Sequence, residues 1–302
     1  MYDIIIVGAG PAGLTSSIYG RRALKKVLVF EALSYGGQIV NTLKIDNYPA
    51  MPGVSGFDFA SKLFNQAKDL GSEIKFEKVI KIEDKEDFKL VTTNKGSYKS
   101  KTVILASGCD NRKLGIDGEE ELTGKGVSYC ATCDGAFYKG DNVAVVGGGN
   151  TALEDALYLC DICKKVYLIH RRDEFRAEKA TLDELKKRDN IEVILNTNVT
   201  KINGEDRLDF IEVTDKMGSK RSIDVSGLFI AVGKIPENEN FRNIINLNDS
   251  GYVETGEDCH TNIEGIYAAG DVRVKSLRQL VTAESDGAVA AMEAVKYINS
   301  RD

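Results

Sequence analysis

The feature that most constrains this chain is a glycine-rich segment that occurs twice in the same local context. In the first copy, Gly8-Ala9-Gly10-Pro11-Ala12-Gly13 follows the apolar run Ile4–Val7. In the second, Gly147-Gly148-Gly149-Asn150-Thr151-Ala152 follows Val143–Val146, and the copies align without a gap at an offset of 139 residues (147 minus 8). A helix-like stretch and a second apolar run follow each segment, which indicates a duplicated βαβ unit.

Glycines in such a segment have separate physical roles. One permits a tight turn, one lets a pyrophosphate approach the backbone, and one lets the helix pack closely on the strand. The helix N-terminus then offers N–H groups and a positive dipole end to the phosphates. We therefore expect an α/β fold with two Rossmann-like dinucleotide-binding domains. The expected loop contacts are Gly8, Gly10, Pro11, Ala12 and Gly13 in the first copy and Gly147, Gly149, Asn150 and Thr151 in the second.

The residue that ends the second strand of each copy indicates which nucleotide binds. Glu31 ends this strand in the first copy, where a carboxylate can accept hydrogen bonds from both ribose hydroxyls. The matching residue of the second copy is His170, followed by Arg171, Arg172 and, one helical turn further, Arg176. Cations suit a 2′-phosphate, so the second copy favours NADPH over NADH. A solvated basic helix start is the alternative.

Further apolar runs that end in glycine set the expected domain order. They are Thr102–Ser107 before Gly108, Leu228–Val232 before Gly233, and Gly265–Ala269 before Gly270-Asp271. A chain of 302 residues is long enough for two domains. We expect the first domain to be discontinuous, with residues 1–113 and 244–302, and the second domain, residues 114–243, to be inserted into it.

A cysteine pair, Cys130 and Cys133, precedes the second glycine loop. Two cysteines at this spacing on a turn can form a reversible disulfide, and one can depress the pKa of the other. Asp134 can carry the proton that a thiolate leaving group needs, with a turn or cap role as the alternative. Cys160 and Cys163 form a second pair near the end of a helix, where we expect them to pack.

Metal binding is a weaker interpretation of these cysteines. Together the pairs read Cys-x2-Cys-x26-Cys-x2-Cys, but zinc ribbons usually have a spacer of about 15–20 residues, and this one already contains a strand, a glycine loop and a helix. The isolated Cys109 and Cys259 are expected to pack. With only two histidines, His170 and His260, we expect no metal.

Composition excludes several other classes of protein. The 40 basic residues are scattered among 46 acidic ones, for a net charge of -6, which argues against a nucleic-acid surface. No apolar run approaches the roughly 20 residues that span a bilayer, and no cationic signal region is visible. We therefore expect a cytoplasmic protein that works with small molecules or other proteins rather than a membrane.

Two dinucleotide sites with a dithiol between them imply electron transfer from NADPH through a flavin to a disulfide. The chain closely resembles the low-molecular-weight, bacterial-type thioredoxin reductases nearly from end to end. The matching segments are Gly8–Gly13, Gly36-Gly37-Gln38, Asn47-Tyr48-Pro49, Cys130–Gly135, Gly147–Ala152 with Glu154, His170–Ala177, Gly270-Asp271-Val272, and Arg278-Gln279 leading to Asp286-Gly287.

The resemblance implies that the outer domain binds FAD and the inserted domain binds NADPH. It implies that Cys133 faces the flavin, that Cys130 attacks the disulfide of a separate thioredoxin, and that Asp134 is the acid–base residue. It also implies a homodimer that alternates between two domain orientations. The departures from the family pattern are Glu284-Ser285, where small residues are usual, and Ala50 in place of a glycine.

Cofactor contacts are carried over position by position. Asp271 would hydrogen-bond the FAD chain, and the segment around Asp286 and Gly287 would place backbone N–H groups at the flavin ring. Glu154 would join the NADPH site. The full set expected at FAD beyond the first loop is Glu31, Gly37, Gln38, Asn47, Gly108, Gly270, Asp271, Arg278, Gln279, Asp286 and Gly287.

Three alternatives remain open at this point. The carrier can be a glutaredoxin-like or peroxiredoxin-reducing protein instead of thioredoxin. A ferredoxin-fed enzyme is a related alternative, although it has little need for Arg171, Arg172 and Arg176. A non-enzymatic nucleotide-binding module or zinc adaptor is the contrasting class.

Overall fold

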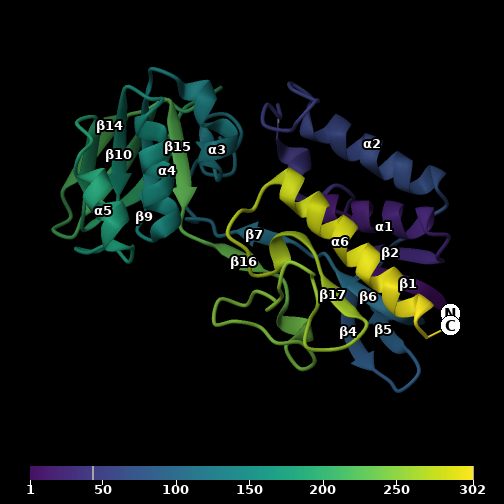
Figure 1. Ribbon diagram of the computed structural model, residues 1–302. Helices are drawn as coiled ribbons and strands as arrows, with labels where there is room; N and C mark the ends of the chain where they lie inside the picture. The colour runs from purple at the N-terminus through teal and green to yellow at the C-terminus, as the bar shows by residue number, and fades with distance from the viewer. Residues whose placement is uncertain (43, 302) are drawn as a thin grey trace. The chain divides into compact units, whose positions relative to one another are not determined.

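The computed structural model describes residues 1–42 and 44–301 (Figure 1). The chain divides into two compact units, residues 1–110 with 235–302 and residues 111–234. It leaves the first unit three residues before the expected 113 and re-enters it at residue 235, nine residues (244 minus 235) before the expected 244. The return is early because only Val232 and Gly233 separate the last strand of the inserted unit from the strand that leads back.

The first unit is built on a seven-stranded sheet with the order β3-β2-β1-β6-β5-β4, and β17 also pairs with β6. The strands β1, β2, β3, β6 and β17 are parallel, whereas β4, β5 and β6 pair antiparallel. The sheet strands are β1 (Tyr2–Val7), β2 (Val27–Glu31), β3 (Glu73–Phe76), β4 (Val79–Asp84), β5 (Lys89–Thr93), β6 (Ser97–Leu105) and β17 (Ile266–Ala268).

Helices cover one face of this sheet, where α1, α2 and α6 lie together (Figure 1). Ile4 and Ile6 of β1 point into this helical layer, and their neighbour Ile5 points to the opposite face, where it shares a core with side chains from β4, β5 and residues 241–253. The helices are α1 (Pro11–Arg22), η1 (Gly37–Asn41), α2 (Gly56–Asp69), η3 (Glu239–Phe241), η4 (Gly270–Val272) and α6 (Leu280–Asn299). The apolar run Ile4–Val7 of β1 is therefore buried on both sides, as a central parallel strand must be.

The second unit has a five-stranded parallel sheet with the order β11-β10-β9-β15-β8 and a three-stranded antiparallel sheet. The parallel strands are β8 (Val127–Ser128), β9 (Asn142–Gly147), β10 (Lys165–Ile169), β11 (Ile191–Ile194) and β15 (Gly227–Ala231). The antiparallel strands are β12 (Thr197–Asn203), β13 (Phe210–Asp215) and β14 (Lys220–Asp224). Two further strands, β7 (Cys109–Asn111) and β16 (Lys234–Pro236), form the chain crossings and pair with each other.

Helices and the small sheet cover opposite faces of the parallel sheet in this unit. Val143 and Val145 of β9 pack on the helical side, and Ala144 and Val146 pack on the side of the antiparallel sheet. The helices are α3 (Ala131–Asp134), η2 (Gly135–Tyr138), α4 (Asn150–Cys160) and α5 (Lys179–Leu185). The two units thus confirm the expected α/β class, with a βαβ unit opening each parallel sheet.

The carboxyl ends of the parallel strands bring the glycine segments together within each unit. Gly8 follows β1, Gly108 follows β6 and Gly270 follows β17, and these three strands are neighbours. In the inserted unit, Gly147 ends β9 and Gly233 follows β15. Ligands of open parallel α/β sheets bind at this edge. Within residues 1–42 and 44–301, no helix is both long and apolar enough to cross a membrane.

Candidate redox and nucleotide-binding sites

The first glycine loop is shaped by contacts that exclude side chains. Gly8 has φ +109°, and a Cβ there would lie 2.3 Å from the carbonyl oxygen of Ala106. A Cβ on Gly13 would lie 1.9 Å from the carbonyl oxygen of Gly8, so α1 starts directly against the end of β1. Gly10, the N-cap of α1, differs: the nearest atom to its added Cβ is the Cα of Gly37, at 3.9 Å. The loop is therefore tight toward the protein and open at Gly10.

The start of α1 leaves its first turn available to a ligand. Gly10 contributes no side-chain hydrogen bond as the N-cap, and Pro11 occupies the first helical position, which needs no N–H. Ala12 and Gly13 follow in the same first turn and are buried. The sequence of this segment thus produces an uncapped helix start with a positive dipole end, a favourable position for an anion.

Glu31 lies beside this loop at the end of β2. Its Oε2 accepts a hydrogen bond from the backbone N–H of Ala9 at 2.9 Å, and its Oε1 accepts one from Leu33 at 2.9 Å. The two backbone donors hold the carboxylate at the mouth of the loop, where the sequence placed a ribose-binding acid.

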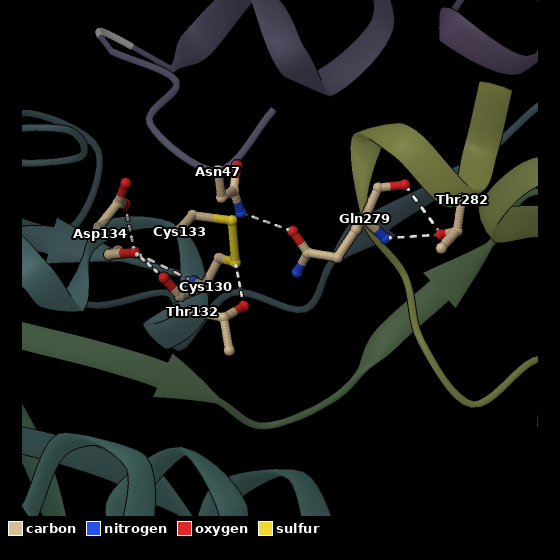
Figure 2. Close-up of a disulfide and its surroundings, with 8 residues drawn as sticks. Asn47, Cys130, Thr132, Cys133, Asp134, Gln279 and Thr282 are labelled. Carbon is tan, nitrogen blue, oxygen red and sulfur yellow. Dashed lines mark hydrogen bonds between the residues drawn. A yellow bond between two sulfur atoms is a disulfide. The ribbon is translucent and has the colours of Figure 1, made fainter. Parts of the chain in front are cut away.

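Four more residues expected at a flavin cofactor lie in the same unit, and two of them contact each other. Asn47 Nδ2 donates to Gln279 Oε1 at 3.0 Å (Figure 2). Gln279 is also the N-cap of α6, forming a reciprocal capping box with Thr282. Gln38 Nε2 donates to Asp110 Oδ1 at 2.6 Å, and Gly37, with φ +60°, lies at the start of η1.

Arg278 and Asp271 follow the carboxyl end of β17. Arg278 Nε donates to the backbone carbonyl of Asp271 at 3.4 Å, and its guanidinium lies 4.2 Å from the centre of the Tyr252 ring. The Sγ of Cys109 lies 3.9 Å from Asp271 Oδ2. Gly270, with φ +81°, immediately precedes Asp271, so a glycine is required at this turn.

The expectation for Asp286 and Gly287 was wrong in its detail. Their backbone N–H groups do not face a ligand, because both residues lie in the interior of α6, where N–H groups bond to carbonyls one turn earlier. A Cβ on Gly287 would lie 2.3 Å from the carbonyl oxygen of Ala12, so this glycine lets α6 pack closely on α1. In the first turn of α6 the backbone N–H of Thr282 is bonded by the Gln279 side chain, which leaves the N–H groups of Leu280 and Val281 without a partner inside the helix.

The Asp286 carboxylate is instead the centre of a buried ion cluster. Arg273 Nη2 and Lys275 Nζ each lie 2.7 Å from a carboxylate oxygen of Asp286, and the backbone N–H of Gly270 donates to the same carboxylate at 3.0 Å. Burial raises the pKa of Asp286, but the hydrogen bonds from Arg273 and Lys275 outweigh it and hold the pKa below its ordinary value. Sequence reasoning missed both cations, although they follow the Gly270-Asp271 turn directly.

The second glycine loop shows the same division between tight and open positions. A Cβ on Gly147 would lie 2.4 Å from the carbonyl oxygen of Ala231, and one on Gly148 would lie 2.1 Å from the His170 ring. At Gly149, the N-cap of α4, no atom lies within 4 Å of an added Cβ, and the helix has no side-chain cap there. Thr151, in the first turn of α4, is exposed, as is Glu154 one turn later.

His170 is buried behind this loop, and its ring stacks on Phe175 with 5.4 Å between centroids. Burial lowers the pKa of His170, and the charges of Arg171 and Arg172 act in the same direction. The histidine is therefore neutral near pH 7, and the arginines carry the positive charge of this region.

The segment that carries the arginines is not the helical turn that the spacing predicted. Residues 171–174 form bends, and Arg176 forms an isolated bridge with Gly149, in which its backbone N–H donates to the carbonyl of Gly148 at 2.7 Å. Asn150 Oδ1 accepts a hydrogen bond from the backbone N–H of Glu178 at 2.9 Å. These bonds place the arginine segment alongside the loop, with the side chains of Arg171 and Arg176 exposed.

The predicted cysteine pair forms a disulfide. Cys130 and Cys133 have Cα atoms 5.3 Å apart, and Cys130 is the N-cap of the short helix α3 (Figure 2). Both residues are half-buried, and the Oγ1 of Thr132 lies 3.5 Å from Cys130 Sγ. The turn continues into Gly135, which packs closely on α4: a Cβ at this position would lie 2.9 Å from Leu159.

Asp134 lies on the same turn and shares a hydrogen bond with a residue that sequence reasoning missed. Ser128 Oγ, on β8, donates to Asp134 Oδ2 at 2.7 Å. Burial raises the pKa of Asp134 above its ordinary value, and the hydrogen bond from Ser128 opposes that rise. Cys130, Cys133 and Asp134 are therefore brought together as predicted, with a serine beneath them.

The remaining cysteines are buried thiols, namely Cys109, Cys160, Cys163 and Cys259. Burial raises the pKa of Cys160 and of Cys163 to about 11, so neither is a thiolate near neutral pH. In the part of the chain that the structure describes, no group of three or more His, Cys, Asp or Glu side chains is placed to hold a metal ion.

Glu284, one of the departures from the expected pattern, contacts Tyr48. Burial raises the pKa of the Glu284 carboxyl, and the hydrogen bond from Tyr48 acts against that rise. Burial, together with the Glu284 carboxylate, raises the pKa of Tyr48 to about 12. The carboxyl on α6 thus has a phenol partner in the same unit.

Comparisons with known proteins agree over the full chain. Residues 2–287 match the family model described as pyridine nucleotide-disulphide oxidoreductase. A thioredoxin reductase of Listeria monocytogenes is 43% identical over 302 residues, covering 99% of this chain and 94% of that protein. The crystal structure of thioredoxin reductase from Streptococcus pyogenes is 40% identical, covers 99% of both chains and has a TM-score of 0.95. A Lactococcus lactis thioredoxin reductase, described as in the FR conformation, is 38% identical, covers 99% of this chain and 100% of that chain, and has a TM-score of 0.69.

Proposed function

Because the chain belongs to the pyridine nucleotide-disulphide oxidoreductase family, and within it to the thioredoxin reductases, we propose that it reduces the disulfide of thioredoxin with electrons from NADPH. The electrons pass through FAD and the Cys130–Cys133 pair. The observation that carries this proposal is the half-buried Cys130–Cys133 disulfide with Asp134 on the same turn. That arrangement occurs in a chain with two open, uncapped glycine loops.

FAD fits the first unit. The loop Gly8–Gly13 is tight toward the protein and open at Gly10, as a pyrophosphate site requires. Glu31, oriented by two backbone donors, is suited to the adenosine ribose. Further contacts from the same edge are proposed for Gly37, Gln38, Asn47, Gly108, Gly270, Asp271, Arg278 and Gln279. Asp286 and Gly287 lie within α6 and stabilise the elements around the site, Asp286 through its ion cluster and Gly287 through the close packing of α6 on α1.

NADPH fits the second unit. Gly147 and Gly149 form the turn, and Asn150 and Thr151 open α4 beneath the phosphates. Arg171, Arg172 and Arg176 provide the positive charge for a 2′-phosphate. His170 contributes as a neutral packing residue, and Glu154 lies one turn further along α4.

The disulfide is the group that changes state. A flavin held by the first unit would supply the electron pair, which originates from NADPH. The Cys130–Cys133 bond then breaks and leaves two thiols once two protons have been taken up. Cys130, as thiolate, then attacks the thioredoxin disulfide and forms a mixed disulfide, while Asp134 donates a proton to the expelled sulfur. Cys133 attacks Cys130, the second thioredoxin thiol leaves, and the Cys130–Cys133 bond is restored.

Three further features belong to the same proposal. The two units, joined by the paired strands β7 and β16, rotate between the half-reactions, as the separately described conformation of the Lactococcus lactis relative supports. The enzyme works as a homodimer, as family resemblance implies. Its place is the cytoplasm, where a reducing environment keeps thiols such as those of Cys160 and Cys259 reduced.

Substitution of one cysteine tests the proposal. Cys133→Ser should retain flavin reduction by NADPH but abolish thioredoxin-dependent NADPH oxidation, because the disulfide cannot form. Cys160→Ala, at a buried thiol outside the site, is the control and should retain turnover. Both reactions are followed by absorbance, and continued thioredoxin turnover by Cys133→Ser would contradict the assigned role.

The identity of the carrier is tested by comparing the turnover of three carriers. The values of kcat/KM for oxidised thioredoxin, a glutaredoxin-like protein and a peroxiredoxin-reducing protein are measured with the same NADPH supply. The proposal predicts the largest value for thioredoxin. A larger value for either other carrier would replace thioredoxin as the substrate while leaving the cysteine chemistry in place.

A further inference from the structure

Beneath the Cys130–Cys133 turn lies Ser128, a buried residue of the two-residue strand β8. Its backbone is fixed by parallel pairing of β8 with β15, in which Ser128 lies opposite Phe229. The residue is 5% exposed, and the contacts of its hydroxyl are to protein groups. Three such contacts surround the oxygen.

The contacts connect the acid–base residue to the backbone of Cys130. Ser128 Oγ donates to Asp134 Oδ2 at 2.7 Å and accepts a hydrogen bond from the backbone N–H of Cys130 at 3.0 Å. The Cys130 carbonyl lies farther away, at 3.4 Å from the same oxygen. Because the amide can only donate, the hydroxyl proton is directed to the carboxylate, the nearer acceptor.

We propose that Ser128 is a positioning residue that ties the Asp134 carboxyl to the backbone of Cys130 and keeps it ready to exchange a proton with the dithiol. The inference rests on the proposed function, since it concerns the proton steps of that disulfide. The hydroxyl has a partner in both states of the carboxyl. When Oδ2 takes a proton it becomes the donor to Ser128 Oγ, and the hydroxyl proton turns to the Cys130 carbonyl.

The other groups around Asp134 come from its own turn and from two packed elements. Cys130 and Cys133 share the turn with it. Tyr138 lies on η2, and its pKa is raised to about 12 by burial and, in smaller part, by the charges of Asp134 and Asp141. Tyr158 of α4 packs against Gly135, the residue after Asp134: its ring would lie 3.0 Å from a Cβ on that glycine. Tyr138 stays uncharged over the pH range in which a carboxyl titrates. The hydrogen bond from Ser128 therefore opposes the burial-induced rise in the pKa of Asp134 without a contribution from Tyr138.

Removal of the hydroxyl should therefore change the titration of Asp134. The test uses the full-length, oxidised holoenzyme with 13C-labelled aspartate carboxyl carbons, and Asp134 is identified as the resonance missing from Asp134→Asn. The variants Ser128→Thr and Ser128→Val introduce side chains of the same shape as each other, and only the threonine keeps the hydroxyl. Ser222→Ala, on exposed β14, is the control.

The expected result is a shift of the Asp134 midpoint to higher pH by about one to two units in Ser128→Val. Ser128→Thr should restore the midpoint of the unchanged enzyme, and Ser222→Ala should not move it. Ser128→Ala should shift in the same direction as the valine variant. Coincident midpoints in Ser128→Val and Ser128→Thr would overturn the proposal.

A second measurement separates this inference from the proposed function. In the pH profile of thioredoxin turnover, the limb that belongs to Asp134 should lie at higher pH in Ser128→Val than in Ser128→Thr. Coincident limbs would contradict a role for Ser128 in the proton steps. Failure of the unchanged enzyme to reduce thioredoxin would instead contradict the proposed function, and the NMR titration would still decide what Ser128 does to Asp134.

Discussion

Single residues near the second glycine loop divide their work between packing and charge. His170 fills the space that Gly148 leaves and is held neutral by burial, whereas Arg171 and Arg172 remain cationic on the neighbouring backbone. Three basic residues in a row, His170-Arg171-Arg172, do not show this difference in the sequence, because it depends on how the imidazole is packed. The selectivity for a 2′-phosphate is therefore assigned to the arginines.

The arginines provide a residue-scale prediction. Arg171→Ala with Arg172→Ala should lower kcat/KM for NADPH by about 100-fold or more, since two charge-assisted hydrogen bonds are lost and each contributes on the order of 1.5–3 kcal/mol. NADH lacks the 2′-phosphate, so its kcat/KM should change little. Arg188→Ala, which removes an ion pair with Asp161 in the same unit, is the control. Equal losses with both nucleotides would remove the basis for NADPH selectivity.

At the scale of elements, the two helix starts have the same design. Each begins at an open glycine, Gly10 or Gly149, and each follows a strand whose end is packed too tightly for any side chain. The tight glycines position the helix, and the open glycine leaves the space into which a phosphate can move. Spacing alone cannot distinguish these two classes of glycine.

Gly149→Ala tests the open class. The added methyl group meets no atom of the protein within 4 Å, so stability and flavin content should be unchanged, while KM for NADPH should rise about tenfold or more as the methyl obstructs the pyrophosphate. Gly96→Ala, at another position with open space, is the control and should leave KM unchanged. Thermal unfolding and steady-state kinetics supply the measurements, and an unchanged KM in Gly149→Ala would contradict the loop assignment.

The buried ion cluster on α6 yields a stability prediction. Asp286→Ala leaves Arg273 and Lys275 buried without their shared carboxylate, which should cost about 3–5 kcal/mol in urea unfolding. Glu264→Ala, which removes an exposed partner of Arg301, should cost less than about 1 kcal/mol. A similar cost for both variants would show that the cluster contributes no more than a surface pair.

The same cluster sets a pH dependence. The pKa of Asp286 is lower in the folded chain than its ordinary value, so the folded state holds the ionised form. Its stabilisation is present above the ordinary pKa and is lost as the pH falls through the lower folded value. The difference in unfolding free energy between the unchanged protein and Asp286→Ala should therefore shrink in that acidic range.

The sequence alone was enough to predict what local patterns encode. The glycine loops and Glu31 lie at the predicted ends of strands, and the cysteine pair lies on a turn ahead of the second loop, because spacing along the chain determines these positions. Ser128 beside Asp134, and Arg273 with Lys275 around Asp286, were not predicted, because their contacts join segments that only tertiary packing brings together. Asp286-Gly287 was misread for the same reason: proximity to a matched motif does not show which helix face a residue occupies.

At the scale of the whole molecule, one unit interrupts the other, and the chain crosses between them twice through a short pair of strands. Each unit carries its own glycine loop at the carboxyl edge of its own parallel sheet. The inserted unit also carries the disulfide, so the duplicated units have become specialised. Under the proposed function, the inserted unit binds the nicotinamide and carries the dithiol, the outer unit binds the flavin, and the electrons pass between the units.

An anaerobic spectral titration of the intact flavoprotein tests this central claim most directly. NADPH should bleach the visible flavin absorbance at far lower concentration than NADH, and addition of oxidised thioredoxin should restore it. A bound flavin that NADPH cannot bleach, or a bleached flavin that oxidised thioredoxin does not reoxidise, would contradict the account.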